Sequence, residues 1–161
     1  MRIRFHPGTE AWIPSASDLG RIGAWFDPKL PEQATVEIVP RADVVRATGI
    51  EKPPWTFRAV TRDGVSWVLV DGTEDPKSVA FLIAHEACHQ VVAVSPTVHA
   101  ALAEARPRGV PRTSDLFHED DPEEKFCDGI AANLLGYRRD RSWWRRRLAE
   151  MRIRVPPQAE G

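Results

Sequence analysis

The chain has 161 residues, which suits one domain with a hydrophobic core and leaves little room for two. Its apolar fraction of 42% excludes a wholly disordered protein, and its formal net charge of -1 gives the chain as a whole no attraction for nucleic acid or membrane. The N-terminus lacks the apolar stretch of a secretory signal, and two cysteines are too few for a disulfide framework. We therefore expect a cytoplasmic protein with free thiols.

The pattern of apolar residues predicts strands and helices in the first half of the chain and only helices after it. That order is typical of an α+β fold. The predicted strands cover residues 2–6, 34–39, 55–61 and 65–70, and the predicted helices cover residues 15–26, 42–48, 75–94, 98–105, 121–135 and 139–154.

Three short signals support these boundaries. Asp63-Gly64, between two β-rich runs, predicts a hairpin. Asp75-Pro76 and Asp121-Pro122 each combine a helix N-cap with proline at the first helical position, so a long helix should begin at each.

The motif that carries chemistry is His85-Glu86-Ala87-Cys88-His89. Residues four apart on a helix lie almost above one another, so both imidazoles can reach one zinc ion at about 2.0–2.1 Å. Glu86 lies beside them and can take a proton from a water that zinc activates. The alternative is a surface helix that carries two histidines by chance. The apolar run at residues 79–84 instead predicts a buried helix, where a charged cluster needs a metal.

A catalytic zinc also needs a third protein ligand, and Glu124 is the best candidate. Glu124 and Asp128 lie four apart on a face with small residues, which lets two helices approach closely, and Asp128 can accept a hydrogen bond from a ligand histidine. Glu124 can alternatively close a capping box with Asp121. The other candidate ligands are Glu123, Glu119 and His118.

These residues resemble the ImmA/IrrE family of zinc metallo-endopeptidases, compact members of the gluzincins. Residues 84–89 match the family's A-H-E-x-x-H, and residues 124–135 follow its E-x-x-A-N/D-x-F-A-A-x-L-L helix, with Cys127 in place of the alanine and Ile130 in place of the phenylalanine. The resemblance covers residues 65–135. It implies one zinc ion held by His85, His89 and Glu124, with Glu86 as the base and Asp128 supporting a ligand histidine.

We accordingly expect a single zincin-like metallopeptidase domain over residues 1–161, with a twisted, mostly antiparallel sheet packed on the active-site helix. Strands and the first helices occupy residues 1–72, the zinc-binding helices 73–137, and a basic helix and tail 138–161. In gluzincins an extended substrate pairs with an edge strand, which by analogy is residues 65–70. Family members often cleave helix-turn-helix repressors, so the expected partner is a protein substrate, with no membrane partner.

Other residues leave alternatives open. Cys88 and Cys127 lie on the two metal-site helices as small core residues or, alternatively, as a redox switch. An oxyanion-stabilising residue is not singled out by the sequence; the candidates are His99, His118 and Tyr137. The Arg-rich segment 138–148 favours a solvated amphipathic helix over a nucleic-acid-binding one. Besides the peptidase, a zinc-bound interaction module with little catalysis is possible, although such a module has no need of Glu86.

Overall fold

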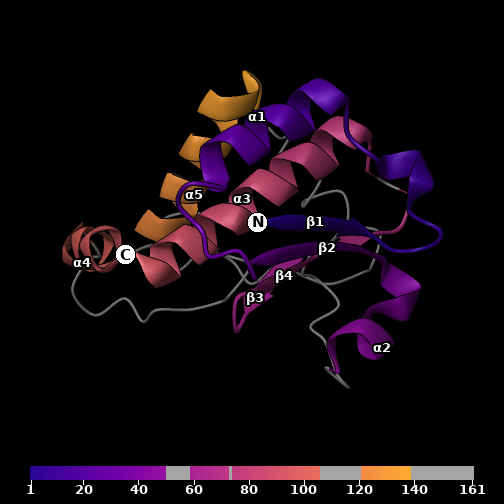
Figure 1. Cartoon of the computed structure of the whole chain (residues 1–161), viewed down its shortest axis with the longest axis horizontal. Helices are drawn as coiled ribbons and strands as arrows, with labels where there is room; N and C mark the ends of the chain where they lie inside the picture. The colour runs from indigo at the N-terminus through magenta and orange to yellow at the C-terminus, as the bar shows by residue number, and fades with distance from the viewer. Residues whose placement is uncertain (50–58, 73, 106–120, 139–161) are drawn as a thin grey trace, which may run out of the picture.

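The computed structural model describes residues 1–49, 59–72, 74–105 and 121–138 (Figure 1). The helices and strands confirm the predicted α+β class. In chain order they are β1 Arg2–Phe5, α1 Ala16–Phe26, β2 Thr35–Pro40, α2 Val44–Thr48, β3 Ala59–Arg62, β4 Val65–Val70, α3 Pro76–Val94, α4 Pro96–Ala105 and α5 Pro122–Leu135, with short 3-10 turns at Glu10–Trp12 and Arg41–Asp43. The predicted helix at 139–154 and the first residues of the predicted strand at 55–61 lie outside the described residues.

The four strands form one mixed sheet in the order β1-β2-β4-β3. β1 and β2 pair in parallel, as do β2 and β4, and only β3 and β4 are antiparallel. The expectation of a mostly antiparallel sheet is therefore wrong. The reason is that α1 intervenes between β1 and β2, and a helical crossover returns the chain in its original direction, whereas a two-residue turn reverses it.

The β3–β4 hairpin turns at Asp63 and Gly64, as predicted. Both residues have positive φ, 52° and 77°, which is the backbone that a two-residue hairpin turn requires. The turn pairs Arg62 with Val65 and places Thr61 opposite Ser66. Because β4 pairs with a strand on each side, it is not the edge strand that the analogy suggested; among the described strands, β3 is the edge on this side.

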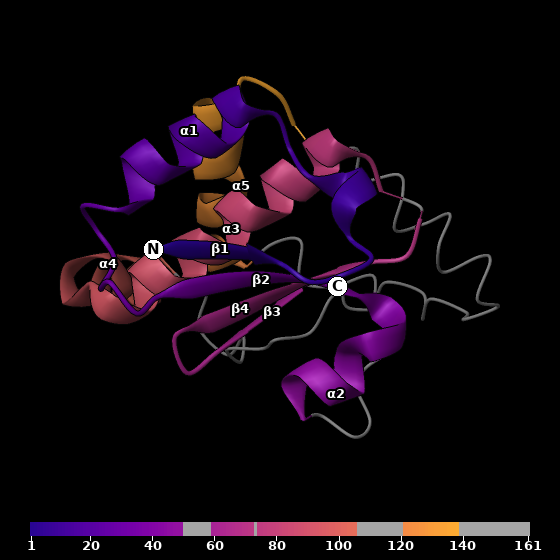
Figure 2. The same cartoon turned by 45° about the vertical axis from the view of Figure 1, so that its right-hand side comes forward.

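Helix α3 crosses one face of the sheet and forms the centre of the molecule. α1, α3 and α5 lie on this face, and α2 lies on the other (Figure 2). α3 contacts β4 and β3 on one side and α5 and α1 on the other, which explains why it is buried along most of its length. Valines and isoleucines of β2 and β4 join α3 in the core.

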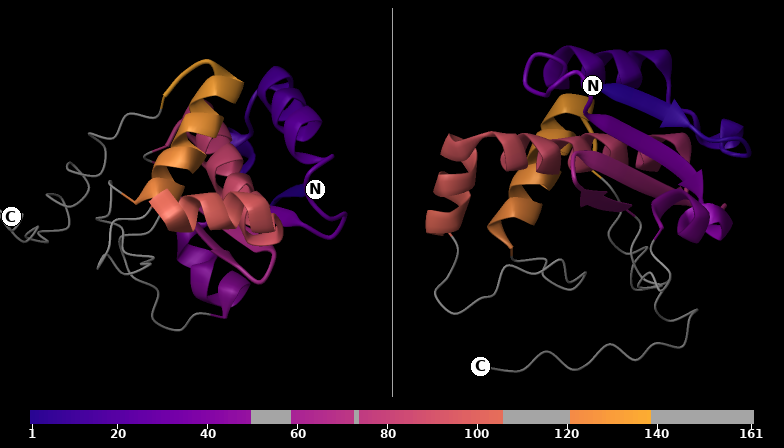
Figure 3. Two further views of the ribbon diagram at one scale, coloured as in Figure 1. Left: turned by 90° about the vertical axis from the view of Figure 1, so that its left-hand side faces the viewer. Right: turned by 60° about the horizontal axis from the view of Figure 1, so that its bottom comes forward.

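Capping residues define where the main helices begin. Ser15 caps α1 by accepting the N–H of Asp18 at 3.1 Å, and Asp75 caps α3 by accepting the N–H of Ser78 at 2.7 Å. α3 ends before Pro96, where the chain turns by 101° into α4 (Figure 3). Of the helices in the described part of the chain, none is long and apolar enough by itself to cross a membrane, although α3 and α4 taken together pass that test.

Candidate metal centre

Helix α3 presents His85 and His89 side by side toward α5. The two Nε2 atoms are 3.1 Å apart, and the imidazole planes meet nearly edge to face at 70°. His85 is 8% exposed, so the pair lies at the edge of the core rather than on an open surface. The one-turn spacing in the sequence therefore becomes a convergence of two nitrogen atoms.

Helix α5 brings Glu124 to the same point. Its Oε2 lies 3.2 Å from the Nε2 of His85, and its Oε1 lies 3.2 Å from the Nε2 of His89. These three side chains each offer a ligand atom, and all the ligand atoms lie within 4.8 Å of one another. The group can hold a metal ion. Glu119 and His118, the alternative ligands, lie outside the described residues.

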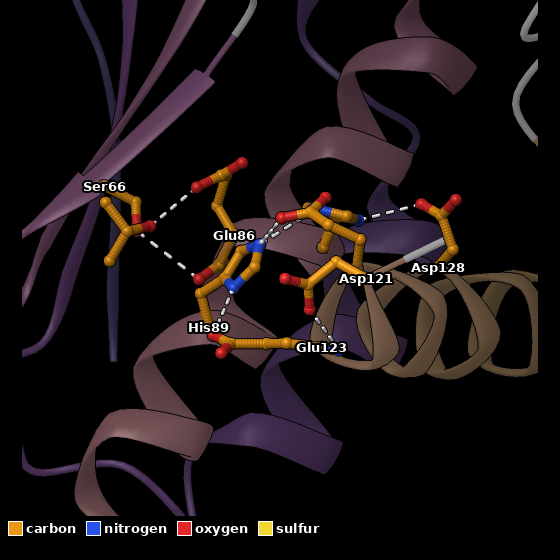
Figure 4. A network of polar contacts seen from close by, with 9 residues as sticks. Ser66, Glu86, His89, Asp121, Glu123 and Asp128 are labelled. Carbon is orange, nitrogen blue, oxygen red and sulfur yellow. Dashed lines mark hydrogen bonds and ion pairs between the residues drawn. The ribbon is translucent and has the colours of Figure 1, made fainter. Parts of the chain in front are cut away.

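The second ring nitrogen of each histidine, Nδ1, is hydrogen-bonded to a carboxylate of α5. The Nδ1 of His85 lies 2.8 Å from Oδ1 of Asp128, and the Nδ1 of His89 lies 2.8 Å from Oε1 of Glu123. Figure 4 shows both carboxylates on the α5 side of the cluster. Such partners fix the ring orientation and make Nδ1 the protonated nitrogen. Asp128 thus lies within hydrogen-bond distance of one predicted ligand histidine, and Glu123 lies in the matching position beside the other.

The N-terminus of α5 is arranged so that Glu124 can face the histidines. Asp121 caps the helix by accepting the N–H of Glu123 at 2.8 Å. The alternative role for Glu124 is to close a capping box with Asp121. In the structure both carboxylate oxygens of Glu124 instead face the two imidazoles. Small buried residues of α5, Cys127 and Ala131, lie against α3 and allow this close approach.

The charges around the two rings favour a cation. If each Nδ1–H donates to its carboxylate, both Nε2 lone pairs point into the same small space, and this repulsion needs a proton or a metal ion to relieve it. Burial alone would lower the pKa of His85, but hydrogen bonds to Asp128 and Glu124 outweigh burial and raise the pKa to about 9. The pKa of His89 is raised well above its ordinary value against burial by Glu123 and Glu124.

The hydrogen bonds that raise the pKa values of the two histidines lower the pKa of Glu124. Burial raises the pKa of a carboxyl group, but here the hydrogen bonds from His85 and His89 more than reverse that effect, and the pKa of Glu124 falls well below its usual range. Glu124 is therefore an ionised acceptor between two rings, which is the state that a metal ligand needs.

Glu86 lies next to the cluster, but its carboxylate is hydrogen-bonded to the sheet. Its Oε2 accepts a hydrogen bond from Oγ1 of Thr61 at 2.6 Å, and Thr61 in turn lies 2.6 Å from Oγ of Ser66. Figure 4 shows Glu86 between Ser66 of the sheet and His89. Neither hydroxyl residue was predicted from the sequence. The sequence did contain a signal for them. A two-residue turn at Asp63-Gly64 pairs Thr61 with Ser66, and Ser66 lies two residues before Val68, on the same buried face of β4.

In the described part of the chain, neither candidate for stabilising the oxyanion, Tyr137 or His99, is hydrogen-bonded to the three ligand residues. The hydroxyl of Tyr137 is within hydrogen-bond distance of Asp18 and of the carbonyl of Lys77, and burial and the nearby charge of Asp18 raise its pKa to about 12. His99 is exposed on α4, and His118 is outside the described residues.

Cys88 and Cys127 meet between α3 and α5. Both are fully buried, as expected of small core residues. A hydrogen bond with Cys127 lowers the pKa of the Cys88 thiol, while burial raises that of Cys127. Complete burial keeps both thiols from solvent oxidants in the folded chain.

A scan of known protein families found none that matches this chain, and a search among curated proteins gave no match either. The resemblance to the ImmA/IrrE family therefore rests on the motif residues 84–89 and 124–135.

Proposed function

We propose that this chain is a zinc-dependent endopeptidase of the ImmA/IrrE type. The observation that carries the proposal is the convergence of three ligand atoms from His85, His89 and Glu124, with the carboxylate of Glu86 beside them and bound to Thr61. A structural metal site is usually closed by four protein ligands, whereas three ligands and a neighbouring carboxylate are typical of hydrolytic zinc sites.

The donor set suits zinc. Ligand atoms at about 2.0–2.1 Å from a tetrahedral zinc ion lie roughly 3.3–3.4 Å from one another. The separation of 3.1 Å between the two Nε2 atoms comes close to these edges, and Glu124 places one carboxylate oxygen 3.2 Å from each Nε2 atom. Imidazole nitrogen with a carboxylate oxygen is also a common zinc environment, and carboxylates behind the imidazoles raise their basicity.

The roles of the residues follow from their positions. A bound zinc ion supplies Lewis-acid chemistry, polarising the scissile carbonyl and making a water molecule more acidic. Glu86 takes a proton from the attacking water as the water oxygen bonds to the carbonyl carbon. When the peptide C–N bond breaks, Glu86 passes that proton to the leaving amine. Asp128 and Glu123 keep the two imidazoles oriented throughout.

The substrate class comes from the family resemblance. We propose that the substrate is a specific protein, with a helix-turn-helix transcriptional repressor as the first candidate. Neither a membrane nor a nucleic acid is required for this activity. A zinc-bound regulatory module that binds such a protein without cleaving it is the alternative, and the following experiment separates the two.

The decisive variant is Glu86→Gln, which keeps the shape of the side chain and removes the base. The two forms are expressed in the same cells, and proteins that disappear with the wild type but persist with Glu86→Gln are identified by mass spectrometry. Loss of a general base typically costs about 10²–10⁴-fold in rate, while zinc content should not change. The control is Glu104→Gln, which alters an exposed glutamate of α4 and should behave like the wild type. Identical protein levels with the wild type and Glu86→Gln would refute the peptidase and favour the binding module.

A further inference from the structure

The base Glu86 is tied to the edge strand of the sheet through a short chain of polar side chains. Thr61 of β3 lies 2.6 Å from Oε2 of Glu86, Ser66 of β4 lies 2.6 Å from Thr61, and Nε2 of Gln90 on α3 lies 2.7 Å from Ser66. Two regularities bring the four residues together. Glu86 and Gln90 are one helical turn apart, and Thr61 and Ser66 are opposite each other across the hairpin.

The direction of every hydrogen bond in this chain can be worked out. Nε2 of Gln90 also donates to the carbonyl oxygen of Thr35 at 2.9 Å, which fixes the orientation of the amide because a flipped amide would set two oxygens against each other. Nε2 therefore donates to Ser66. An ionised Glu86 can only accept, so the single hydroxyl proton of Thr61 goes to Glu86. Ser66 must then donate to Thr61 at 2.6 Å, in preference to the carbonyl oxygen of Glu86 at 3.5 Å. The chain runs from Gln90 through Ser66 and Thr61 to Glu86.

Three of the four residues in this chain are buried and Thr61 is half-buried. Ser66 and Gln90 are almost completely buried, and Glu86 is 6% exposed. Hydrogen bonds to charged groups are about twice as strong as neutral ones, and low local polarity strengthens them further. Through Thr35, Gln90 is anchored to the backbone of β2, so the sheet holds the far end of the chain in place.

We propose that Thr61 is a positioning residue for the base. By occupying Oε2 of Glu86, Thr61 fixes the carboxylate rotamer and leaves Oε1 as the oxygen that takes the proton from water. This inference rests on the proposed peptidase function, and it adds a residue that the metal motif does not contain. Ser66 and Gln90 act through Thr61 by fixing the direction in which its hydroxyl points.

The first test uses stability and needs no substrate. Urea unfolding of the zinc-loaded wild type, Thr61→Val, Glu86→Gln and the double variant forms a double-mutant cycle. Valine matches the shape of threonine but lacks the hydroxyl. The two changes should be coupled by about tenfold in the unfolding equilibrium constant, because Thr61→Val removes the donor of the hydrogen bond and Glu86→Gln removes the charge that strengthens it. Additive effects would overturn the contact between Thr61 and Glu86.

The second test measures hydrolysis of fluorescein-labelled β-casein, an unfolded protein. Thr61→Val should lower kcat about 10–100-fold with KM within about twofold and zinc content unchanged. Thr61→Ser keeps the hydroxyl and should restore most of the rate, which a purely structural role for the residue would not predict. In the Glu86→Gln background, Thr61→Val should have no further effect on kcat. The matched control is Thr48→Val, whose hydroxyl bonds the carbonyl of Val44 on the far side of the sheet.

The two failures can be told apart. An active wild type whose kcat is unchanged by Thr61→Val overturns the role of Thr61 and leaves the peptidase proposal intact. A wild type that cleaves no casein, together with cellular protein levels that are identical for the wild type and Glu86→Gln, counts against the peptidase and removes the catalytic role of Thr61 with it. The stability cycle reports in either case whether Thr61 bonds to Glu86.

Discussion

Zinc and protons should compete for the two histidines at neutral pH. In the metal-free chain, the pKa of His85 is raised from 6.5 to about 9, and that of His89 is raised as well. A raised pKa means that the protonated ring stabilises the fold at pH values below the unfolded pKa, and that this stability is lost as the pH rises through about 9. Zinc binds only the neutral ring, so apparent zinc affinity should rise with pH up to about 9 and then level off.

The size of the effect follows from the pKa. At pH 7, the pH lies about two units below the pKa of His85, so displacing its proton should weaken apparent zinc binding about 100-fold relative to the neutral ring. His89 adds a further loss in the same direction. Binding at pH 7 should therefore release between one and two protons for each zinc ion bound.

Isothermal titration calorimetry of the chelator-treated chain checks both statements. Zinc is titrated at pH 7 in buffers with different protonation enthalpies, since the change in apparent binding enthalpy from buffer to buffer gives the number of protons released. The experiment is repeated from pH 6 to pH 9.5. His99→Gln, a change at an exposed histidine of α4, is the control and should release as many protons as the wild type. A binding enthalpy that is independent of buffer, together with an affinity that is flat from pH 6 to 9, would refute the assigned protonation of the site.

Two further predictions concern the ligands and the residues behind them. Atomic absorption should find about one zinc per chain, most of it lost in His85→Ala and in His89→Ala but kept in His99→Ala; full retention in the first two would remove the site. Asp128→Asn and Glu123→Gln should each weaken zinc binding about 10–100-fold in competition with a chelator, because each loses the carboxylate that orients a ring, and unchanged affinity in both would show that the carboxylates are dispensable.

Local signals predicted the element boundaries well. Asp63-Gly64 gave the hairpin because positive φ at two consecutive positions suits few other residues. The caps at Asp75 and Asp121 gave the starts of the two long helices that carry the site. Each of these signals depends only on residues a few positions apart, so no knowledge of tertiary structure was needed.

Strand direction and strand order depend on contacts that are remote in sequence, and there the prediction was wrong. The apolar pattern of residues 65–70 is compatible with an edge or an interior strand. Only the pairing of β4 with β2 makes it interior. The helix between β1 and β2 favours a parallel pair, because a crossover through a helix returns the chain in its original direction.

The parts of the site that depend on spacing within one helix were predictable, and the parts that depend on contacts between elements were not. Helical spacing alone brings His85 near His89, and Glu124 near Asp128. The pairing of Glu123 with His89 depends on the angle at which α5 crosses α3, and the pairing of Thr61 with Glu86 depends on how the hairpin sits over α3. Neither arrangement is encoded by spacing within one element.

Removal of zinc should leave the fold in place, unlike in a zinc finger, which unfolds without its metal. Two protonated imidazoles bring the same positive charge as one Zn²⁺ beside two neutral rings, so the carboxylates of Glu124, Glu123 and Asp128 keep a compensating charge when the metal leaves. The core that packs α3 on the sheet contains no metal ligand. Chelation at pH 7 should therefore leave the far-UV circular dichroism nearly unchanged and lower Tm while unfolding stays cooperative, since a ligand present at about 1,000 times its Kd adds about 4 kcal/mol to the stability of the folded state. A large loss of helical signal on chelation would mean that the histidine–carboxylate network does not form without its metal.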